Sequence, residues 1–420
     1  MLYNFFRVSL WIMYVCFFRR VYYLRAKNIP QNEPLIFISN HSSGFMDPIL
    51  IAAMQRRPVY FWARAAEFPK NLKGWLMYKL HGLPIYRAKE GKENMHKNEA
   101  TFQKTRDLLY GGVNSAFIAP EGDCVMEKRL RPFKTGCARL AFKMMEEKNW
   151  RIDVKILPAG VNYTYHDLFR SEAYVSLGEP ISVQKYKDLY QEDSAAAIKA
   201  LTADMRVALK AEMIHVETED SVVSEKVFPL IRNSFKRNIL PLYSTNETLF
   251  DKEQQVAQTI SELNKTQQQE LEQTVDAYNT ALDQAGTSDY AVAEKNKRSF
   301  IWVLLGLPVW IVGTIFGRIP HIIARNLRNK LVPYPEFSAS FAFTAAFFVW
   351  ILWSLVFMLV GAFIIGWWTL LLPITMILLQ TAAYHYEDYY KEWKTLVNYR
   401  RVTNKEALKK QRQAVLDLVK

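Results

Sequence analysis

The feature that most constrains the fold is an apolar run, Phe341 to Leu379, that contains no charged side chain. A helix crosses the hydrocarbon core of a bilayer with about 20 apolar residues, so this run is too long for one crossing. We predict two transmembrane helices joined near Gly361 to Gly366. The second helix leads into residues 384–420, which are rich in Lys and Arg. Because basic residues favour the cytoplasmic side, we expect this tail in the cytoplasm.

Two further apolar segments complete the expected membrane elements. Phe300 to Phe316 is short, holds Pro308 and has basic residues on both sides. This pattern favours a re-entrant hairpin or interfacial segment, with a simple crossing as the alternative, within a membrane region of 299–383. Residues 1–30 begin with an aromatic stretch broken by arginines, too short to span. We expect an interfacial helix on the cytoplasmic leaflet, with a buried core helix as the alternative.

Charge and cysteine content narrow the partners. The net charge of +13 indicates an anionic partner. The basic residues lack zinc-finger spacing and RNA-binding aromatic motifs, so we expect membrane lipid and no nucleic acid. Cys16, Cys124 and Cys137 are too few and too irregularly spaced for a disulfide framework or a structural zinc site. No metal is expected, and a reducing cytoplasm is the expected location of the soluble part.

Short β-rich runs alternate with helical stretches over residues 31–182. Alternation of this kind predicts an α/β domain with a mostly parallel sheet, whose right-handed crossovers bring several strand ends to one edge. The expected strands are Ile36 to Ser39, Val59 to Ala63, Leu83 to Arg87, Ala116 to Ala119, Ile156 to Asn162 and Tyr174 to Leu177. Expected helices include Asn98 to Tyr110 and Thr135 to Glu147.

Residues 183–298 are rich in Gln, Glu, Lys, Ala and Asp. Val256, Ile260, Leu263 and Leu271 recur at near-helical spacing, which predicts amphipathic helices. The segment carries no recognisable chemistry, so we interpret it as a structural helical arm.

The stretch IFISNHSSGFMDP, Ile36 to Pro48, holds the strongest candidate for chemistry. His41 follows a predicted buried strand, and the carboxyl ends of strands are where open α/β sheets bind ligands. Asp47 before Pro48 predicts a helix start, with a side chain able to cap it. A histidine with a carboxylate in reach can act as a general base, since the carboxylate fixes the tautomer and stabilises the imidazolium. The alternative is a polar loop histidine and a simple helix cap.

Three other stretches suit an anion and an acyl group. In GLPIYR, a strand ends in Arg87, a planar donor suited to phosphate. In PEG, Glu121 and Gly122 follow a strand, and Glu121 could bind a substrate hydroxyl or orient a basic neighbour. Lys134 precedes a helix start near Gly136, whose N–H groups could hold a phosphate.

In contrast, Lys128 and Arg129 are expected on a solvated face. In LPAGVNY and the segment after it, Pro158 normally marks an edge strand or a kink that lines a substrate site. His166 and Arg170 lie in the polar crossing that follows.

These ordered motifs, His41 with Asp47, then GLPIYR, PEG and LPAGVNY, resemble the glycerolipid acyltransferase superfamily over roughly Ile36 to Ile181. The resemblance implies an α/β domain on the membrane surface. Two departures narrow it: five residues rather than four separate His41 from Asp47, and Asp123-Cys124 stands where the superfamily has Thr-Arg. Both departures, with PFKTGCARLA and NYTYHDLFRSEAYVSLGEPI, look like the fungal-type glycerol-3-phosphate and dihydroxyacetone-phosphate acyltransferases. That subgroup also carries hydrophobic segments after the catalytic domain.

The resemblance implies an integral membrane O-acyltransferase of phospholipid biosynthesis, with its catalytic domain on the cytoplasmic face. A fatty acyl donor, an acyl-CoA or acyl carrier protein thioester, would serve as co-substrate without a cofactor. The acceptor would be a phosphorylated glycerol: glycerol-3-phosphate or dihydroxyacetone phosphate. Acylation of lysophosphatidate shares every motif and stays open, as does an inactive membrane scaffold.

The roles follow residue by residue. His41 is the expected base and Asp47 its partner. Because the motif arginine is missing, Arg87, Lys134 and Arg170 are the expected phosphate contacts. The tetrahedral oxyanion would need N–H donors in the loop Asn40 to Gly44 or at the helix start near Gly136.

Overall fold

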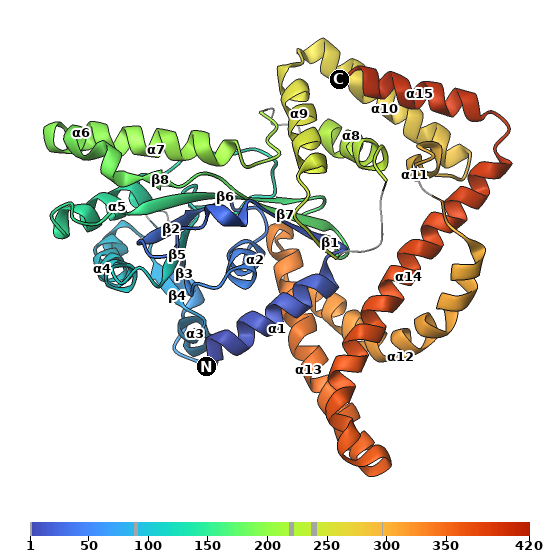
Figure 1. The fold of residues 1–420 in the computed structure, drawn as a ribbon, viewed down its shortest axis with the longest axis horizontal. Helices are drawn as coiled ribbons and strands as arrows, with labels where there is room; N and C mark the ends of the chain where they lie inside the picture. Colours follow the sequence, from blue (N-terminus) through green and yellow to red (C-terminus); the bar gives the residue numbers. More distant parts are fainter. Residues whose placement is uncertain (1, 88–90, 218–221, 237–241, 296) are drawn as a thin grey trace. The chain divides into compact units, whose positions relative to one another are not determined.

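A computed structural model describes residues 2–87, 91–217, 222–236, 242–295 and 297–420 (Figure 1). The chain divides into two units, Met1–Met213 with Tyr243–Thr245, and Ile214–Leu242 with Asn246–Lys420. Each unit is described here by itself.

The first unit alternates strands and helices. Its strands are β1 (Arg20–Leu24), β2 (Leu35–Ile38), β3 (Val59–Arg64), β4 (Gly82–Ile85), β5 (Ser115–Ile118), β6 (Lys155–Tyr163), β7 (Glu172–Leu177), β8 (Ile181–Ser182) and β9 (Tyr243–Ser244). Its α-helices are α1 (Leu2–Phe17), α2 (Met46–Met54), α3 (Leu72–Lys79), α4 (Asn98–Leu109), α5 (Gly136–Glu147), α6 (Lys187–Glu192) and α7 (Ser194–Lys210). Each strand and helix expected within 31–182 is present, with ends shifted by one or two residues.

The strands form one sheet in the order β4-β3-β5-β2-β6-β7-β1-β9, with β8 beside β6. Neighbouring strands run parallel except where β6 meets β7 and β8. The predicted α/β fold with a mostly parallel sheet is therefore confirmed. β2 lies inside the sheet between β5 and β6, and all four of its residues are fully buried, as a strand covered on both faces requires.

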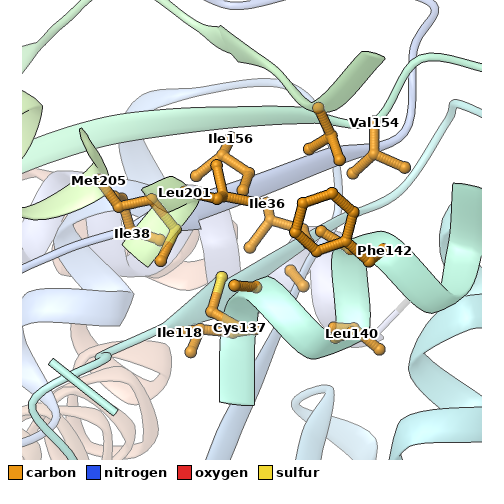
Figure 2. Packing of buried hydrophobic residues seen from close by; sticks show 14 of the residues in the cluster. Ile36, Ile38, Ile118, Cys137, Leu140, Phe142, Val154, Ile156, Leu201 and Met205 are labelled. Atoms are coloured by element: carbon orange, nitrogen blue, oxygen red, sulfur yellow. The ribbon is translucent and has the colours of Figure 1, made fainter. Parts of the chain in front are cut away.

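One face of the sheet carries an apolar core (Figure 2). Ile36 and Ile38 of β2 point to this face, where α5 contributes Leu140 and Phe142. Helix α7 adds Leu201 and other apolar side chains to the same cluster. Thus α7 packs on the α/β core, although its sequence falls in the stretch predicted as the arm. Helices α1 and α2 lie on the opposite side of the sheet from α7 (Figure 1).

One local prediction is wrong, and one of the two alternatives for Pro158 is excluded. The expected N-terminal helix ends at Phe17, and residues 20–24 form strand β1 instead, because Val-Tyr-Tyr suits a strand and pairs in parallel with β7. Pro158 does not mark an edge, since β6 is an interior strand. The proline is tolerated because it lies where β6 changes antiparallel partners, from β8 at Ile156 to β7 at Ala159.

The second unit is helical. Its α-helices are α8 (Val222–Asn233), α9 (Thr248–Glu262), α10 (Lys265–Gln284), α11 (Asp289–Val292), α12 (Phe300–Leu331), α13 (Ser338–Ile365), α14 (Leu372–Arg401) and α15 (Lys405–Asp417). Three of the apolar residues predicted at helical spacing are buried: Val256, Ile260 and Leu271. Within the segment predicted as a basic tail, α15 packs against α10, and Arg412 pairs with Asp289 at 2.8 Å.

Two stretches of this unit, Phe300–Leu331 and Pro335–Arg401, are helical, long and apolar enough to cross a bilayer, which indicates membrane association. The expected hairpin at Phe300 to Phe316 is wrong, since α12 continues through Pro308 as one helix. Its glycines let α14 approach closely; a Cβ on Gly313 would lie 2.2 Å from the Leu379 carbonyl oxygen. The second stretch divides at Gly366, whose φ of 59° ends α13 within the predicted joint.

Candidate active site

Four parallel strands end at the edge of the sheet where the candidate residues gather. His41 follows β2, Arg87 follows β4, and Glu121 follows β5. Tyr163 is the last residue of β6. Because parallel strands place their carboxyl ends together, residues far apart in the sequence meet here, as the alternating pattern predicted.

His41 and Asp47 are in direct contact. Nδ1 of His41 lies 2.8 Å from Oδ2 of Asp47. The Asp47 side chain is fully buried, whereas the His41 side chain is 23% exposed. Three other donors already point at this carboxylate, so it acts as an acceptor and Nδ1 carries the proton. The lone pair of the imidazole is therefore on Nε2, the nitrogen that can accept a proton from a substrate.

The three other donors come from the loop after β2 and from the end of β6. The N–H groups of Ser42 and Ser43 donate to Oδ2 at 3.0 and 3.1 Å. The hydroxyl of Tyr163 donates to Oδ1 at 2.7 Å. Asp47 does lie in the first turn of α2, but its carboxylate faces the loop instead of capping the helix, which has no side-chain cap. The structure thus contradicts the interpretation of Asp47 as a simple cap.

Glu121 holds the backbone of the same loop. Its Oε1 accepts the N–H of His41 at 3.3 Å, and its Oε2 accepts the N–H of Arg131 at 2.9 Å. Burial raises the pKa of Glu121, and these two N–H groups oppose that rise. Glu121 therefore connects the loop after β5 to the backbone of His41.

A cationic group lies beside Glu121. Arg87 reaches across β3, roughly 10 Å of sheet, and donates to the Gly122 carbonyl at 3.0 Å and to Asp123 Oδ1 at 2.8 Å. Gly122 has a φ of 77°, and a Cβ added there would lie 2.7 Å from Nζ of Lys134. Arg87, Gly122 and Lys134 are therefore neighbours, and Glu121 joins them to His41.

Arg170 makes its described contacts elsewhere. Its N–H donates to the Phe17 carbonyl at 3.0 Å and its guanidinium to the Phe18 carbonyl at 3.4 Å, at the end of α1. The same crossing reaches the His41 loop through another residue, since Ser43 Oγ donates to the His166 carbonyl at 3.1 Å.

At this edge one expectation is wrong, and the structure argues against one of the two alternatives for the oxyanion donors. Lys128 is not solvated: it is 5% exposed, and its ammonium donates to the Tyr163 carbonyl at 2.8 Å. The loop Asn40 to Gly44 is also a poor oxyanion site. The N–H groups of His41, Ser42 and Ser43 donate to Glu121 and Asp47, and that of Gly44 lies 3.2 Å from the sulfur of Cys124. A short loop around a buried carboxylate uses its own donors to hold that carboxylate.

Sequence reasoning missed Tyr163 and misjudged Lys128. The only signal for Tyr163 was its place at the carboxyl end of a predicted strand, next to the edge where His41 was expected. Lys128 stood in a run of basic residues, where burial of one member leaves no trace in composition.

Comparison with known families shows which class of protein this domain is similar to. Residues 20–162 match the family model described as Acyltransferase. This match, with the relatives described below, confirms the predicted likeness of this part of the chain to the glycerolipid acyltransferase superfamily.

Within that class the chain is similar to two proteins of Saccharomyces cerevisiae (strain ATCC 204508 / S288c). It is 40% identical to glycerol-3-phosphate O-acyltransferase 1 over 72 residues, and 33% identical to glycerol-3-phosphate O-acyltransferase 2 over 107 residues. These matches cover 17% and 25% of this chain, but only 9% and 14% of the yeast proteins.

Among solved structures, the 1-acyl-sn-glycerophosphate (LPA) acyltransferase PlsC from Thermotoga maritima matches at 18% identity and a TM-score of 0.30. That match covers 46% of this chain and 80% of the other.

Proposed function

We propose that this chain is an O-acyltransferase of phospholipid biosynthesis that transfers a fatty acyl group from an acyl thioester to glycerol-3-phosphate, or to dihydroxyacetone phosphate. The observation that carries the proposal is the His41–Asp47 contact of 2.8 Å, which leaves Nε2 of His41 as the basic nitrogen at the edge of an acyltransferase-family sheet.

In the proposed reaction, Nε2 of His41 takes the proton of the acceptor hydroxyl while the acceptor oxygen attacks the thioester carbonyl. A C–O bond forms, and the tetrahedral intermediate then breaks its C–S bond. The imidazolium returns the proton to the leaving thiolate. Asp47 accepts the proton of Nδ1 in a hydrogen bond throughout and stabilises the imidazolium. No side-chain nucleophile is required. The helix start at Gly136 remains our proposed source of oxyanion donors, since the first N–H groups of a helix lack partners within it.

Arg87 and Lys134 are the proposed contacts of the acceptor phosphate. Both lie beside Gly122, and Glu121 connects that loop to His41, so a phosphate there could present its glycerol hydroxyl toward Nε2. Arg170 stays a prediction, since its described contacts are with the end of α1.

Replacing the proposed phosphate contacts tests this part of the reaction. Arg87→Gln should raise the KM for the phosphorylated acceptor about tenfold or more, the effect of losing one charge-assisted hydrogen bond. Arg170→Gln should also raise it if that residue has the predicted role. Arg151→Gln, an exposed arginine beyond the far end of α5, is the control. An unchanged KM in either test variant removes the phosphate role from that residue.

Lipid contact would bring the acyl chain to this site. Phe5, Val8 and Trp11 of α1 are exposed at helical spacing, which suits the interfacial role proposed for this helix. The hydroxyl of Tyr14, on the same helix, donates to the Met46 carbonyl beside Asp47 at 3.3 Å. A bilayer bound to α1 on the cytoplasmic face would thus lie close to His41, and an acyl chain could remain in lipid during transfer.

The function is tested with purified full-length protein in lipid vesicles, a labelled acyl thioester and one of three acceptors: glycerol-3-phosphate, dihydroxyacetone phosphate or lysophosphatidate. We expect transfer to one or both of the first two. Transfer to lysophosphatidate alone would establish the alternative reaction. Absence of transfer to all three, from acyl-CoA and from acyl carrier protein thioesters, would favour an inactive scaffold.

A further inference from the structure

Tyr163 contacts the His41–Asp47 pair through the Asp47 oxygen that His41 does not contact. It is the last residue of β6 and is 2% exposed, and its hydroxyl donates to Oδ1 of Asp47 at 2.7 Å. In the sequence, only its place at the carboxyl end of a predicted strand pointed to it. The contact joins residues 116 positions apart in the chain, so only the fold makes it.

The two oxygens of Asp47 have different partners. Oδ2 accepts from Nδ1 of His41 and from the N–H groups of Ser42 and Ser43, all three from the loop after β2. Oδ1 accepts from the hydroxyl of Tyr163, which lies at the end of β6. Two anchors on opposite oxygens fix the rotation of the carboxylate plane. The tyrosine also draws part of the negative charge away from the oxygen that faces His41.

The ring of Tyr163 is held by packing that does not need its hydroxyl. It stacks on Phe18, with ring centroids 5.8 Å apart and an interplanar angle of 22°. The ring of His166 meets it edge-on at 5.7 Å. On the backbone, Tyr163 pairs with Ala173 of β7, and its carbonyl accepts from Lys128 at 2.8 Å. A phenylalanine could keep each of these contacts.

We propose that Tyr163 is a positioning residue for acyl transfer, completing a Tyr163–Asp47–His41 chain that orients the imidazole and tunes its basicity. This inference rests on the proposed function.

The hydroxyl is a permanent donor. Burial raises the pKa of Tyr163 well above its ordinary range, and the negative charge of Asp47 raises it further. The phenol therefore stays neutral wherever the enzyme works, and Asp47 keeps this partner at every stage of proton transfer.

The test is Tyr163→Phe in full-length protein reconstituted in vesicles, with kcat and KM measured across pH. Loss of a hydrogen bond to a charged group should lower kcat/KM about tenfold, with little change in the KM for the acceptor. Without the donor, more negative charge faces His41 and favours the imidazolium. The acid limb of the kcat/KM profile should therefore move to higher pH, by about half a unit to one unit. Loss of packing alone would lower the rate without moving that limb.

Tyr174→Phe is the matched control. Tyr174 is also fully buried in the β6–β7 pair, but it pairs with Asn162 and so points to the opposite face of the sheet from Tyr163. We expect wild-type rates and an unshifted profile from this variant.

A double-mutant cycle shows whether the effect passes through Asp47. In an Asp47→Asn background the carboxylate is gone, so adding Tyr163→Phe should lower the rate by less than twofold. An equal loss in both backgrounds, or a wild-type rate and profile in Tyr163→Phe, would overturn the inference while leaving the proposed function intact. Transfer that survives His41→Ala would contradict both.

Discussion

Glu121 gives the sharpest test of how the loop after β2 is held. Its carboxylate is 9% exposed and accepts two backbone N–H groups, from His41 at 3.3 Å and from Arg131 at 2.9 Å. In Glu121→Gln, the side-chain amide has one oxygen and one NH₂ group. One of the two backbone donors must then face another donor.

The size of the effect follows from this mismatch. A buried donor left without an acceptor costs about 1–3 kcal/mol of folding free energy. Burial also raises the pKa of Glu121, so removing the carboxylate recovers part of its desolvation and keeps the net loss near 2 kcal/mol. For a unit of this size, 2 kcal/mol corresponds to a fall in Tm of about 4–8 °C. Because the displaced loop carries His41, kcat should fall about tenfold.

Thermal unfolding of purified protein in detergent, followed by tyrosine and tryptophan fluorescence, measures the first effect. Acyl transfer in vesicles measures the second. Glu127→Gln is the control, because Glu127 is 27% exposed and forms ion pairs with Arg129 and Arg131 on the same loop. Such partly exposed pairs contribute about 0–1 kcal/mol. If Glu121→Gln is as stable as Glu127→Gln and keeps its kcat, Glu121 does not hold the loop. If only the KM for the acceptor rises, it binds substrate instead.

Two further predictions concern the same edge of the sheet. Gly122→Ala should raise the KM for the acceptor and lower Tm, because φ is 77° and the new Cβ would lie 2.7 Å from Nζ of Lys134. Gly111→Ala, with no atom within 4 Å of the new Cβ, should change neither quantity, and equal behaviour of the two variants would refute the clash. Burial, aided by the charge of Lys128, lowers the pKa of His166 from 6.5 to about 3, so below pH 6.5 only the unfolded chain takes up this proton. The free energy of unfolding should therefore fall by about 2 kcal/mol between pH 7 and pH 5. An equal fall over this pH range in His166→Gln, measured by thermal unfolding, would contradict this.

The sequence predicted the α/β fold because its strands carry local signals. Leu35 to Ile38 form a short apolar run followed by polar residues, and the strand they form is buried on both faces. The sequence also placed Arg87 at the end of a strand and His41 and Glu121 just after strands, and parallel topology brings such positions together. Motif order and strand ends were thus enough to predict most of this edge.

Other features depend on contacts that no local pattern records. Residues 20–24 were predicted as part of the interfacial helix, but they form a strand that pairs with β7 and β9, both far away in the sequence. Helix α12 continues through Pro308, and its glycines lie against α14, which is far away in the sequence. The contacts of Tyr163 and Lys128 form because the end of β6 lies beside the loops after β2 and β5. Arg170 was predicted to replace the missing motif arginine, and its described contacts lie at the end of α1.

The central claim, that Nε2 of His41 accepts the proton of the acceptor hydroxyl, is tested most directly by His41→Ala in full-length protein reconstituted in vesicles. The rate of labelled acyl transfer to the preferred acceptor should fall by about 10²- to 10⁴-fold, the usual contribution of a general base. Since the imidazole is 23% exposed, Tm should change little. A rate near that of the wild type, from protein with an unchanged Tm, would contradict the claim.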